Sequence, residues 1–360
     1  MMYECARYLR ARGHEVNVFA NEWEGDCNDG ITFSYVPMRR QPFFLSGLSY
    51  FRRCTAALAK ASFDVLNAHG CICPTGGVHW VHSVQRAWLE RSKTFRPPLS
   101  IARLRQRINP LHPILLGLER EHFEKRKYRK VIALTENVRS DLNRFYGVPA
   151  EDVVVIPNGY SPAEFNPERR MERRGEMRLK LGLKPEDVAL LFVAHELDRK
   201  GYATILSALQ ILDSQKLRLF VVGRNAASRV MKEAAKFGVE DQVIACGPTR
   251  DVAGYHAASD VFVLPTQYEA FCLAILEALG SGLPVVTTRI PGAEDAIQPG
   301  RNGFVIDDPK SGEQLAEALR LLLDEDCRSQ LSNNASASVS KYQWDWVLEQ
   351  YENVLRSACN

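Results

Sequence analysis

The sequence predicts an α/β protein of two doubly wound domains that face each other across a cleft. Its 360 residues exceed what a single compact core usually holds. Short β-branched runs alternate with helical stretches throughout, which is the pattern of parallel sheets covered by helices. The alternation restarts after a polar, turn-rich stretch near residue 160. We therefore expect one sheet in each half, with ligands bound outside the carboxyl ends of the strands.

Each half has its own series of expected elements. An amphipathic helix over 1–12, which Gly13 ends, opens the first half. Strands of the first half are expected at 16–20, 32–36, 65–68, 77–82, 131–135 and 153–156. The second half has expected strands at 189–194, 218–222, 243–246, 261–264, 285–287 and 303–306, and helices at 202–212, 227–237, 252–258, 271–279 and 312–323. Between the halves, the turn formers of 157–167 and the charged stretch 168–178 form the best linker candidate.

The composition argues against several classes of function. The formal net charge is only +3, which gives no general reason to expect binding to nucleic acid. Nine cysteines show no paired metal-binding spacing, so we expect free thiols in a reducing cytoplasm. No apolar run approaches the roughly 18 residues of a membrane span, and we expect no signal peptide.

One segment is strongly basic. Residues 86–130 contain 13 Lys and Arg against 4 Asp and Glu. Apolar residues are interleaved with these charges, namely Phe95, Ile101, Leu104, Ile108 and Leu111. Such a segment can seat the first domain on an anionic bilayer, as a peripheral protein at the inner face of the cytoplasmic membrane. The alternative is a solvated pair of helices that covers the sheet.

Two carboxylates, Glu269 and Glu277, flank a stretch that is otherwise almost wholly apolar. A helix that is apolar on every side is normally buried, so Glu277 must find hydrogen-bond donors there or lose its charge. If the helix begins near Phe271, its rise places the two acids about 12 Å apart across the helix N-terminus. A nucleotide sugar has a similar length. Its diphosphate can bind the free amides at the positive end of the helix dipole, with ribose at one carboxylate and hexose at the other.

Further candidates follow other strands of the second half. Arg199-Lys200-Gly201 stands at a strand-to-helix turn, where two cations can neutralise a departing diphosphate without a metal. Gly223 permits a close approach by a base or ribose, and Arg250 can stack on the base. The alternatives are a solvated pair of charges for 199–200 and plain polar turns for the other two.

The first half offers two histidines, His79 and His82, near the end of an expected strand. Alternation places them on different faces, so one of them can face the cleft. There it can order an acceptor or share a proton with the acceptor hydroxyl. A packed and satisfied strand histidine is the alternative. His14 and His256 lie near helix ends, and we interpret both as structural.

Several of these motifs resemble those of the family 4 retaining glycosyltransferases, which have two Rossmann-like domains in the GT-B fold. Glu269 and Glu277, with seven residues between them, look like the family signature, and 278–287 and 292–295 resemble the run that follows it. The other similar motifs are Arg199-Lys200-Gly201, Ile156-Pro-Asn-Gly159 with Phe165, and Arg12-Gly-His-Glu-Val16. Segments 21–27 and 194–201 look most like members that add glucose to a heptose of the lipopolysaccharide core.

The resemblance implies a role for each matching residue. Glu277 would hold the ribose hydroxyls, Glu269 the donor hexose, and Arg199 with Lys200 the diphosphate. The implied amide contacts to sugar and phosphate come from Ala270, Phe271, Cys272 and Leu273. His82 falls roughly where members keep an acceptor-side polar or acidic residue. Retaining members favour front-face substitution, in which the leaving diphosphate takes the acceptor proton, so neither glutamate need be a nucleophile.

The function that the resemblance implies is transfer of a hexose from a nucleoside diphosphate sugar, a UDP-sugar by preference, in cell-envelope glycan synthesis. The acceptor is expected to be a saccharide or lipid-linked, and no cofactor or metal is expected. The implied domains are 1–160 and 161–340, with a helix over 341–360 packing back on the first. Two alternatives stay open. The chain can be a non-catalytic, donor-binding partner in a heteromeric complex, or a nucleotide-sugar epimerase, for which the sequence offers no convincing pair of acid and base.

The sequence departs from the family pattern at its start. Members begin with a strand and a Gly-Gly loop that approaches the diphosphate, and neither precedes the helix over 1–12. Because that strand is central in its sheet, its loss would expose unpaired backbone groups on both neighbours. We expect the natural chain to start roughly 20 or more residues upstream, enough for a strand and its loop, or this version to be unstable or inactive. A well-folded and active 360-residue form would contradict this expectation.

Overall fold

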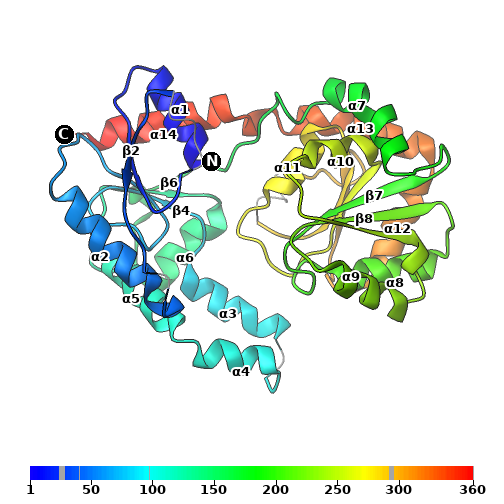
Figure 1. The fold of residues 1–360 in the computed structure, drawn as a ribbon, viewed down its shortest axis with the longest axis horizontal. Coiled ribbons are helices and arrows are strands. Elements are labelled where there is room, and N and C mark those ends of the chain that lie inside the picture. Colours follow the sequence, from blue (N-terminus) through cyan, green and yellow to red (C-terminus); the bar gives the residue numbers. More distant parts are fainter. Residues whose placement is uncertain (24–28, 40, 97, 292–295, 360) are drawn as a thin grey trace. The chain divides into compact units, whose positions relative to one another are not determined.

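The computed structural model describes residues 1–23, 29–39, 41–96, 98–291 and 296–359. The chain forms two units, both of α/β type with parallel sheets, as the sequence predicts (Figure 1). The first unit comprises Met1–Asn158 and Trp344–Asn360, and the second comprises Gly159–Gln343. Within the described part of the chain, no helix is long and apolar enough to cross a membrane.

A six-stranded parallel sheet forms the centre of the second unit, in the order β12-β11-β10-β7-β8-β9. Its strands are β7 Val188–Val193, β8 Leu217–Val222, β9 Val243–Gly247, β10 Val261–Leu264, β11 Val285–Thr288 and β12 Gly303–Ile306. The two central strands, β7 and β10, pair Leu190 with Val261. The strand order reverses between them, and such a topological switch point is where ligands of open doubly wound sheets bind.

Helices cover both faces of this sheet. They are α7 Pro167–Lys180, α8 Tyr202–Leu212, α9 Ala227–Lys236, α10 Val252–Ala258, α11 Leu273–Gly280, α12 Gly312–Leu323 and α13 Glu325–Ser338, with short 3-10 turns at Glu240–Gln242 and Ser340–Tyr342. Figure 1 shows α8, α9 and α12 on one side, and α10 and α11 on the other, where α7 contacts α10 and α13 contacts α11. Leu190, Leu191 and Phe192 are fully buried, as expected for a strand covered on both faces.

The charged stretch expected to belong to a linker is instead the helix α7 of the second unit. The Asn166 side chain accepts a hydrogen bond from the backbone amide of Arg169 in the first turn, and Pro167 follows Asn166. Both features favour the start of a helix at this point. Arg174 and Arg178 form ion pairs with buried Asp260 at 2.5 and 3.1 Å, and both donate to carbonyls at the end of α10. The linker prediction was therefore wrong for 167–178, because the arginines of this stretch bind α7 to the end of α10.

The first unit contains two separate parallel sheets. In one, β1 Asn17–Ala20 pairs with β2 Thr32–Tyr35. The other has the order β3 Asn67–His69, β4 Val78–Val81, β5 Lys130–Ala133 and β6 Val153–Val155. The helices are α1 Met2–Ala11, α2 Ser46–Leu58, α3 Gln85–Phe95, α4 Ile101–Ile108, α5 Leu111–Phe123, α6 Glu136–Tyr146 and α14 Trp344–Ala358, with 3-10 turns at Phe43–Leu45 and Ala150–Asp152.

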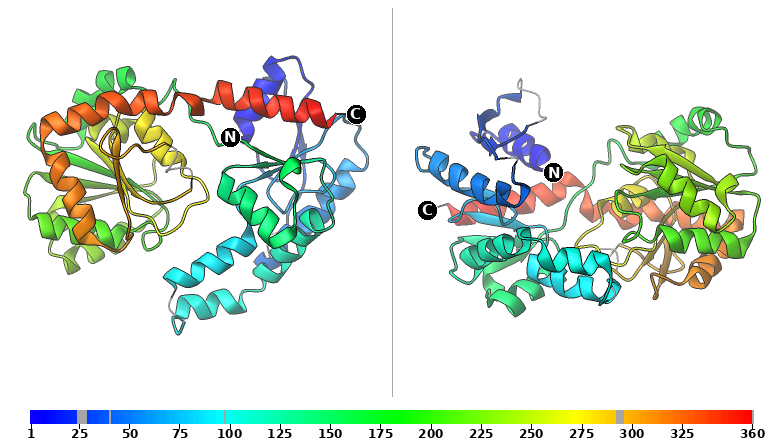
Figure 2. Two further views of the ribbon diagram at one scale, coloured as in Figure 1. Left: turned by 180° about the vertical axis from the view of Figure 1, so that it is seen from behind. Right: turned by 60° about the horizontal axis from the view of Figure 1, so that its bottom comes forward.

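The last helix, α14, belongs to the first unit, where it contacts β4 and α1 (Figure 2). Glu352 of α14 is buried and accepts hydrogen bonds from His14 at 2.8 Å and Arg12 at 3.3 Å. The ring of Tyr351 lies 5.0 Å from that of Trp80 on β4. These contacts fix the turn after α1 to the end of the chain, and they give His14 the structural role that the sequence suggested.

Candidate functional site

Three charged side chains meet at the switch point of the second unit. Arg199 and Lys200 lie in the loop after β7, and Glu269 lies in the loop after β10. The Glu269 carboxylate is 2.8 Å from Nη1 of Arg199 and 2.5 Å from Nζ of Lys200. Their side chains are only 11 to 17 % exposed, so the three form one compact and largely desolvated cluster.

The loops that carry this cluster are held together by backbone contacts. The Gln267 amide donates to the Arg199 carbonyl at 2.9 Å, and the Thr266 hydroxyl donates to the same carbonyl at 3.3 Å. Gly201 has a φ of +84°, and a Cβ there would lie 2.0 Å from the carbonyl oxygen of Pro265. Because only glycine tolerates this approach, the third residue of the Arg-Lys-Gly motif serves the packing of the two loops.

The resemblance implied that Arg199 and Lys200 bind the diphosphate of the donor. In the structure both cations pair with Glu269, and Arg199 also pairs with Glu196 at 3.2 Å. Residue spacing could not show this, because the ion pairs join residues about 70 positions apart. The cluster is therefore already close to neutral before any anion arrives.

Helix α11 begins beside this cluster. It starts at Leu273 rather than at Phe271, and its N-cap Cys272 provides no side-chain hydrogen bond to the first turn. Amides at this end therefore lack a side-chain cap and are suited to bind an anion. The predicted contact residues Ala270 to Leu273 form the approach to this helix and its first position.

Cysteine chemistry has no place at this site. Burial raises the pKa of the Cys272 thiol to about 12, so it stays protonated at neutral pH. The cysteines of the described residues are free thiols, as the sequence predicted. In that same part of the chain, no group of three His, Cys, Asp or Glu side chains is arranged to hold a metal ion.

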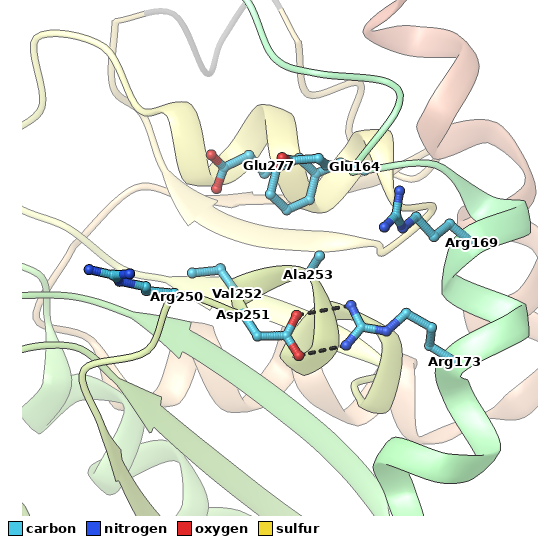
Figure 3. Close-up of a pocket in the computed structure, with 9 residues that line it drawn as sticks. Glu164, Arg169, Arg173, Arg250, Asp251, Val252, Ala253 and Glu277 are labelled. Carbon is cyan, nitrogen blue, oxygen red and sulfur yellow. Dashed lines mark hydrogen bonds and ion pairs between the residues drawn. The ribbon is translucent and has the colours of Figure 1, made fainter. Parts of the chain in front are cut away.

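Glu277, on α11, lines a separate cavity of about 330 Å³ in the second unit (Figure 3). It accepts no hydrogen bond from any other described residue. Burial raises its pKa to about 7, and the nearby charge of Glu164 adds to the effect. We expected from the sequence that this carboxylate would either find hydrogen-bond donors or lose its charge. With a pKa of about 7, it is partly protonated at neutral pH.

The rest of this cavity is lined by several charged side chains together with Phe165, Val252 and Ala253. Arg173 of α7 forms a bidentate pair with Asp251 at 2.9 and 2.5 Å, and Asp251 in turn caps α10 (Figure 3). Arg250, a predicted donor-binding residue, lies on the opposite wall from Arg169. Sequence reasoning missed Glu164, Arg169, Arg173 and Asp251, because charged residues in polar stretches look like an ordinary solvated surface.

Gly223 makes a close contact within the chain. Its φ is +148°, and a Cβ there would lie 1.8 Å from the carbonyl oxygen of Ala194. The Asn225 side chain donates to the same carbonyl at 2.7 Å. The close approach that requires glycine is therefore made by the chain itself, between the loops after β7 and β8.

His82 lies in the first unit, just after β4. Its ring stacks on those of His69 and Trp80, with centroids 5.6 and 6.4 Å away. Burial lowers its pKa to about 4, so the imidazole is neutral at pH 7 and can accept a hydrogen bond. His79 is buried in other surroundings, 4.3 Å from the ring of His122, in agreement with the predicted alternation. The sequence pattern did not indicate His69, on which the His82 ring stacks.

Two segments that carried the family resemblance lie wholly or partly outside the described residues. Residues 292–295 are not described, and the same holds for 24–28, which overlap the segment 21–27. The remaining predicted site residues are all within the described structure.

A doubly wound sheet with a cluster of charged side chains at its switch point, beside an uncapped helix N-terminus, is an arrangement typical of α/β enzymes. Known families narrow this class. Residues 173–338 match the model of glycosyl transferases group 1, and residues 1–164 match that of glycosyltransferase family 4. The chain is 30% identical over 322 residues to the lipopolysaccharide glucosyltransferase WaaG of Escherichia coli strain K12, covering 88% of this chain and 83% of WaaG.

The chain therefore belongs to the GT-B glycosyltransferases. A crystal structure of WaaG, a glycosyltransferase involved in lipopolysaccharide biosynthesis, superimposes with a TM-score of 0.84 at 27% identity, covering 98% of this chain and 94% of that one. Anabaena Alr3699/HepE in complex with UDP-glucose shares the fold, with a TM-score of 0.70 at 18% identity and coverage of 99% and 94%. The resemblance seen in the sequence and the expected fold are confirmed.

Proposed function

We propose that the chain is a retaining hexosyltransferase that uses a nucleoside diphosphate sugar, preferably a UDP-sugar, in the synthesis of a cell-envelope glycan. The observation that carries this proposal is the cluster of Arg199, Lys200 and Glu269 beside the uncapped start of α11. The name of WaaG, a lipopolysaccharide glucosyltransferase, supports the hexose and the saccharide or lipid-linked acceptor. The bound UDP-glucose of HepE supports the donor class.

We assign one part of the nucleotide-sugar donor to each of the predicted binding groups. The diphosphate binds the amides of 270–273 and the cations Arg199 and Lys200. Glu269 accepts hydroxyls of the hexose, and Glu277 accepts those of the ribose. Arg250, at the edge of the Glu277 cavity, stacks on the base.

The transfer step needs no protein nucleophile. The bond from the hexose C1 to the diphosphate oxygen breaks, and its electron pair stays on that oxygen. A bond from C1 to the acceptor oxygen forms on the same face, and the acceptor proton passes to the departing diphosphate. Negative charge grows on the diphosphate as it leaves, where Arg199 and Lys200 stabilise it in a desolvated site without a metal. Neutral His82 orders the acceptor.

A thermal-shift screen against UDP-glucose, UDP-galactose, ADP-glucose and GDP-mannose tests the donor, because a ligand that binds only the folded state raises the apparent stability. NMR of the transfer product then reports the anomeric configuration, and added chelator reports any need for metal. Arg229→Ala, which removes a surface ion pair with Asp198, is the control variant. An inverted product contradicts retention, and loss of turnover with chelator contradicts metal independence. Binding without transfer or hydrolysis favours the non-catalytic alternative.

The orientation of α4 supports a membrane role for the basic segment. Ile101, Leu104 and Ile108 are 60 to 70 % exposed, and α4 has no buried residue. Its contacts with the protein are polar instead, since Gln106 donates to Ser92 at 2.6 Å. Figure 2 shows α4 beside α3, on the side away from the sheet. This inverts the usual amphipathic arrangement, in which the apolar stripe faces the core.

We further propose that α4 inserts its apolar side into an anionic bilayer at the inner face of the cytoplasmic membrane, with Arg105 and Arg107 near the headgroups. The triple substitution of Ile101, Leu104 and Ile108 by serine is expected to abolish flotation with phosphatidylglycerol vesicles. The same three substitutions leave the charge of the segment unchanged. Wild-type protein that fails to float, or that floats equally with phosphatidylcholine, would remove this role.

A further inference from the structure

A second cavity lies in the first unit, among α3, α5 and α6, and takes no part in the proposed transfer. Its volume of about 290 Å³ is near the lower end of the range for small-molecule sites. Each of the three helices contributes one arginine to its lining, namely Arg86, Arg120 and Arg144. The other lining residues are Leu116, Glu124, Phe145 and Tyr146.

The three guanidinium groups differ in how far their charge is already neutralised. Arg144 donates to Glu90 at 2.7 Å. Arg120 donates to a backbone carbonyl one turn back, at 3.4 Å, and forms no ion pair with a described residue. The side chain of Arg86 has neither a hydrogen bond nor an ion pair within the described structure. With Glu124 as the one acidic lining residue, the lining carries a net charge of +2.

A buried carboxylate fixes the three helices around this cavity. Glu119 of α5 is 1% exposed, and its Oε1 accepts the Gln85 amide of α3 at 2.6 Å. Its Oε2 accepts the hydroxyl of Tyr146, on α6, at 2.5 Å. Burial raises the pKa of Glu119, and the hydrogen bonds from Tyr146 and the α3 amides oppose that rise. The arginines therefore project from backbone positions that are set before a ligand arrives.

We propose that this cavity is a binding site for a phosphate monoester. A guanidinium group matches two phosphate oxygens with parallel N–H donors, which makes arginine the preferred partner of phosphate. A phosphate monoester carries a charge of about −1.5 to −2 at neutral pH, which complements the lining. Leu116 and Phe145 offer apolar surface to the carbon skeleton of the ester. The ester can belong to a soluble compound or to a lipid such as phosphatidic acid.

The test uses glycerol 3-phosphate in titration calorimetry, and phosphatidylcholine vesicles with and without phosphatidic acid in flotation. The cavity variant is Arg86→Gln/Arg120→Gln. Its matched control is Arg52→Gln/Lys60→Gln, which removes two exposed cations of the same unit. At an ionic strength of about 0.15 M, we expect the cavity variant to lose about tenfold or more in affinity and the control to keep wild-type affinity. Arg86→Lys, which keeps the charge but loses the bidentate donors, should weaken binding by a smaller factor.

The outcomes separate the two sources of the ester. If glycerol 3-phosphate shows the expected pattern, the site takes a soluble ligand. If only vesicles with phosphatidic acid show it, the ligand is a lipid headgroup, and α4 is intact in both variants. Equal losses in the cavity variant and the control, no loss in either, or no binding by the wild type in both assays would overturn the site. Thermal unfolding of each variant shows that the comparison is made on folded protein.

Discussion

Glu269 and Glu277 lie eight residues apart around the start of α11, yet only one of them is paired with cations. Glu269 lies within 2.8 Å of two cations. Glu277 has no donor among the described residues, and burial raises its pKa to about 7. The charge of Glu269 is therefore compensated by neighbouring cations before a ligand arrives, whereas the charge of Glu277 is not.

The difference suggests how the donor is recognised. A partly buried carboxylate without a partner costs stability, and hydroxyl donors from a ligand remove that cost. In the proposed function, ribose would supply these donors to Glu277. The proposed diphosphate would instead share the cations around Glu269, which are already in position, so reorganisation would stay small when the leaving group develops charge.

Loss of a cation from the balanced cluster should have the largest effect. We expect Lys200→Ala to lower the single-turnover rate of hexose transfer by about 10²- to 10³-fold, the usual cost of removing one group that stabilises a developing anion. Lys236→Ala, which removes a lysine paired with Glu233 on the surface, should leave the rate within about twofold, because such exposed pairs contribute little. A loss of only a few-fold in Lys200→Ala would mean that the cluster is structural.

Substitution of the two glutamates should affect stability in opposite directions. Glu277→Gln removes a desolvated charge, so we expect it to raise the melting temperature at pH 8 while weakening donor binding by about 10- to 100-fold. Glu269→Gln leaves two largely buried cations without their counter-charge and should lower the melting temperature. Calorimetry of each variant with UDP-glucose provides both measurements. Equal signs of the two stability changes would contradict the difference in charge compensation between the two carboxylates.

Periodic elements of the second unit were predictable from the sequence. The helices Tyr202–Leu212, Val252–Ala258 and Gly312–Leu323 begin and end where their patterns indicated, and so do the strands Val261–Leu264 and Gly303–Ile306. Their boundaries are encoded locally, by glycines, caps and the change of hydrophobic period. In the first unit, strand β3 was expected over 65–68, so its start was placed two residues and its end one residue too early, since its position depends on pairing with β4, where Asn67 lies opposite Val78.

The parts of the site that were missed depend on long-range contacts. Arg173 gains its role from Asp251, 78 residues away, and the cations of the switch point gain theirs from a loop about 70 residues later. A sequence pattern shows which residues are charged, but not which charges meet. The glycines illustrate the same limit, because the close approaches at Gly201 and Gly223 are made by the chain's own carbonyls.

If Glu277 binds the donor as proposed, donor binding should also depend on pH. The pKa of Glu277 is raised from 4.5 to about 7 in the folded protein, so its favourable contribution to stability is complete below pH 4.5 and is lost as the pH rises through 7. Ribose hydroxyls prefer the ionised form. We therefore expect the affinity for UDP-glucose to fall about tenfold per pH unit below 7 and to level off above it.

UDP-glucose is the suitable probe, because its diphosphate has no terminal phosphate to titrate near pH 6. Calorimetry between pH 5.5 and pH 8.5 gives the profile. In Glu277→Gln the pH dependence should disappear. A slope that persists in this variant would place the titrating group elsewhere.

The smallest expected effect comes from Glu164, whose charge is the second cause of the raised pKa of Glu277. Both side chains lie along one wall of the same cavity (Figure 3). Glu164→Gln should therefore move the midpoint of the affinity profile toward lower pH, by a few tenths of a unit, as is usual for an interaction with an exposed charge. The shift should shrink at 1 M salt, where such interactions are screened. Glu168→Gln, an equal change on α7 outside the cavity lining, should leave the midpoint in place; an equal shift in both variants would make the effect one of net charge rather than of this pair of carboxylates.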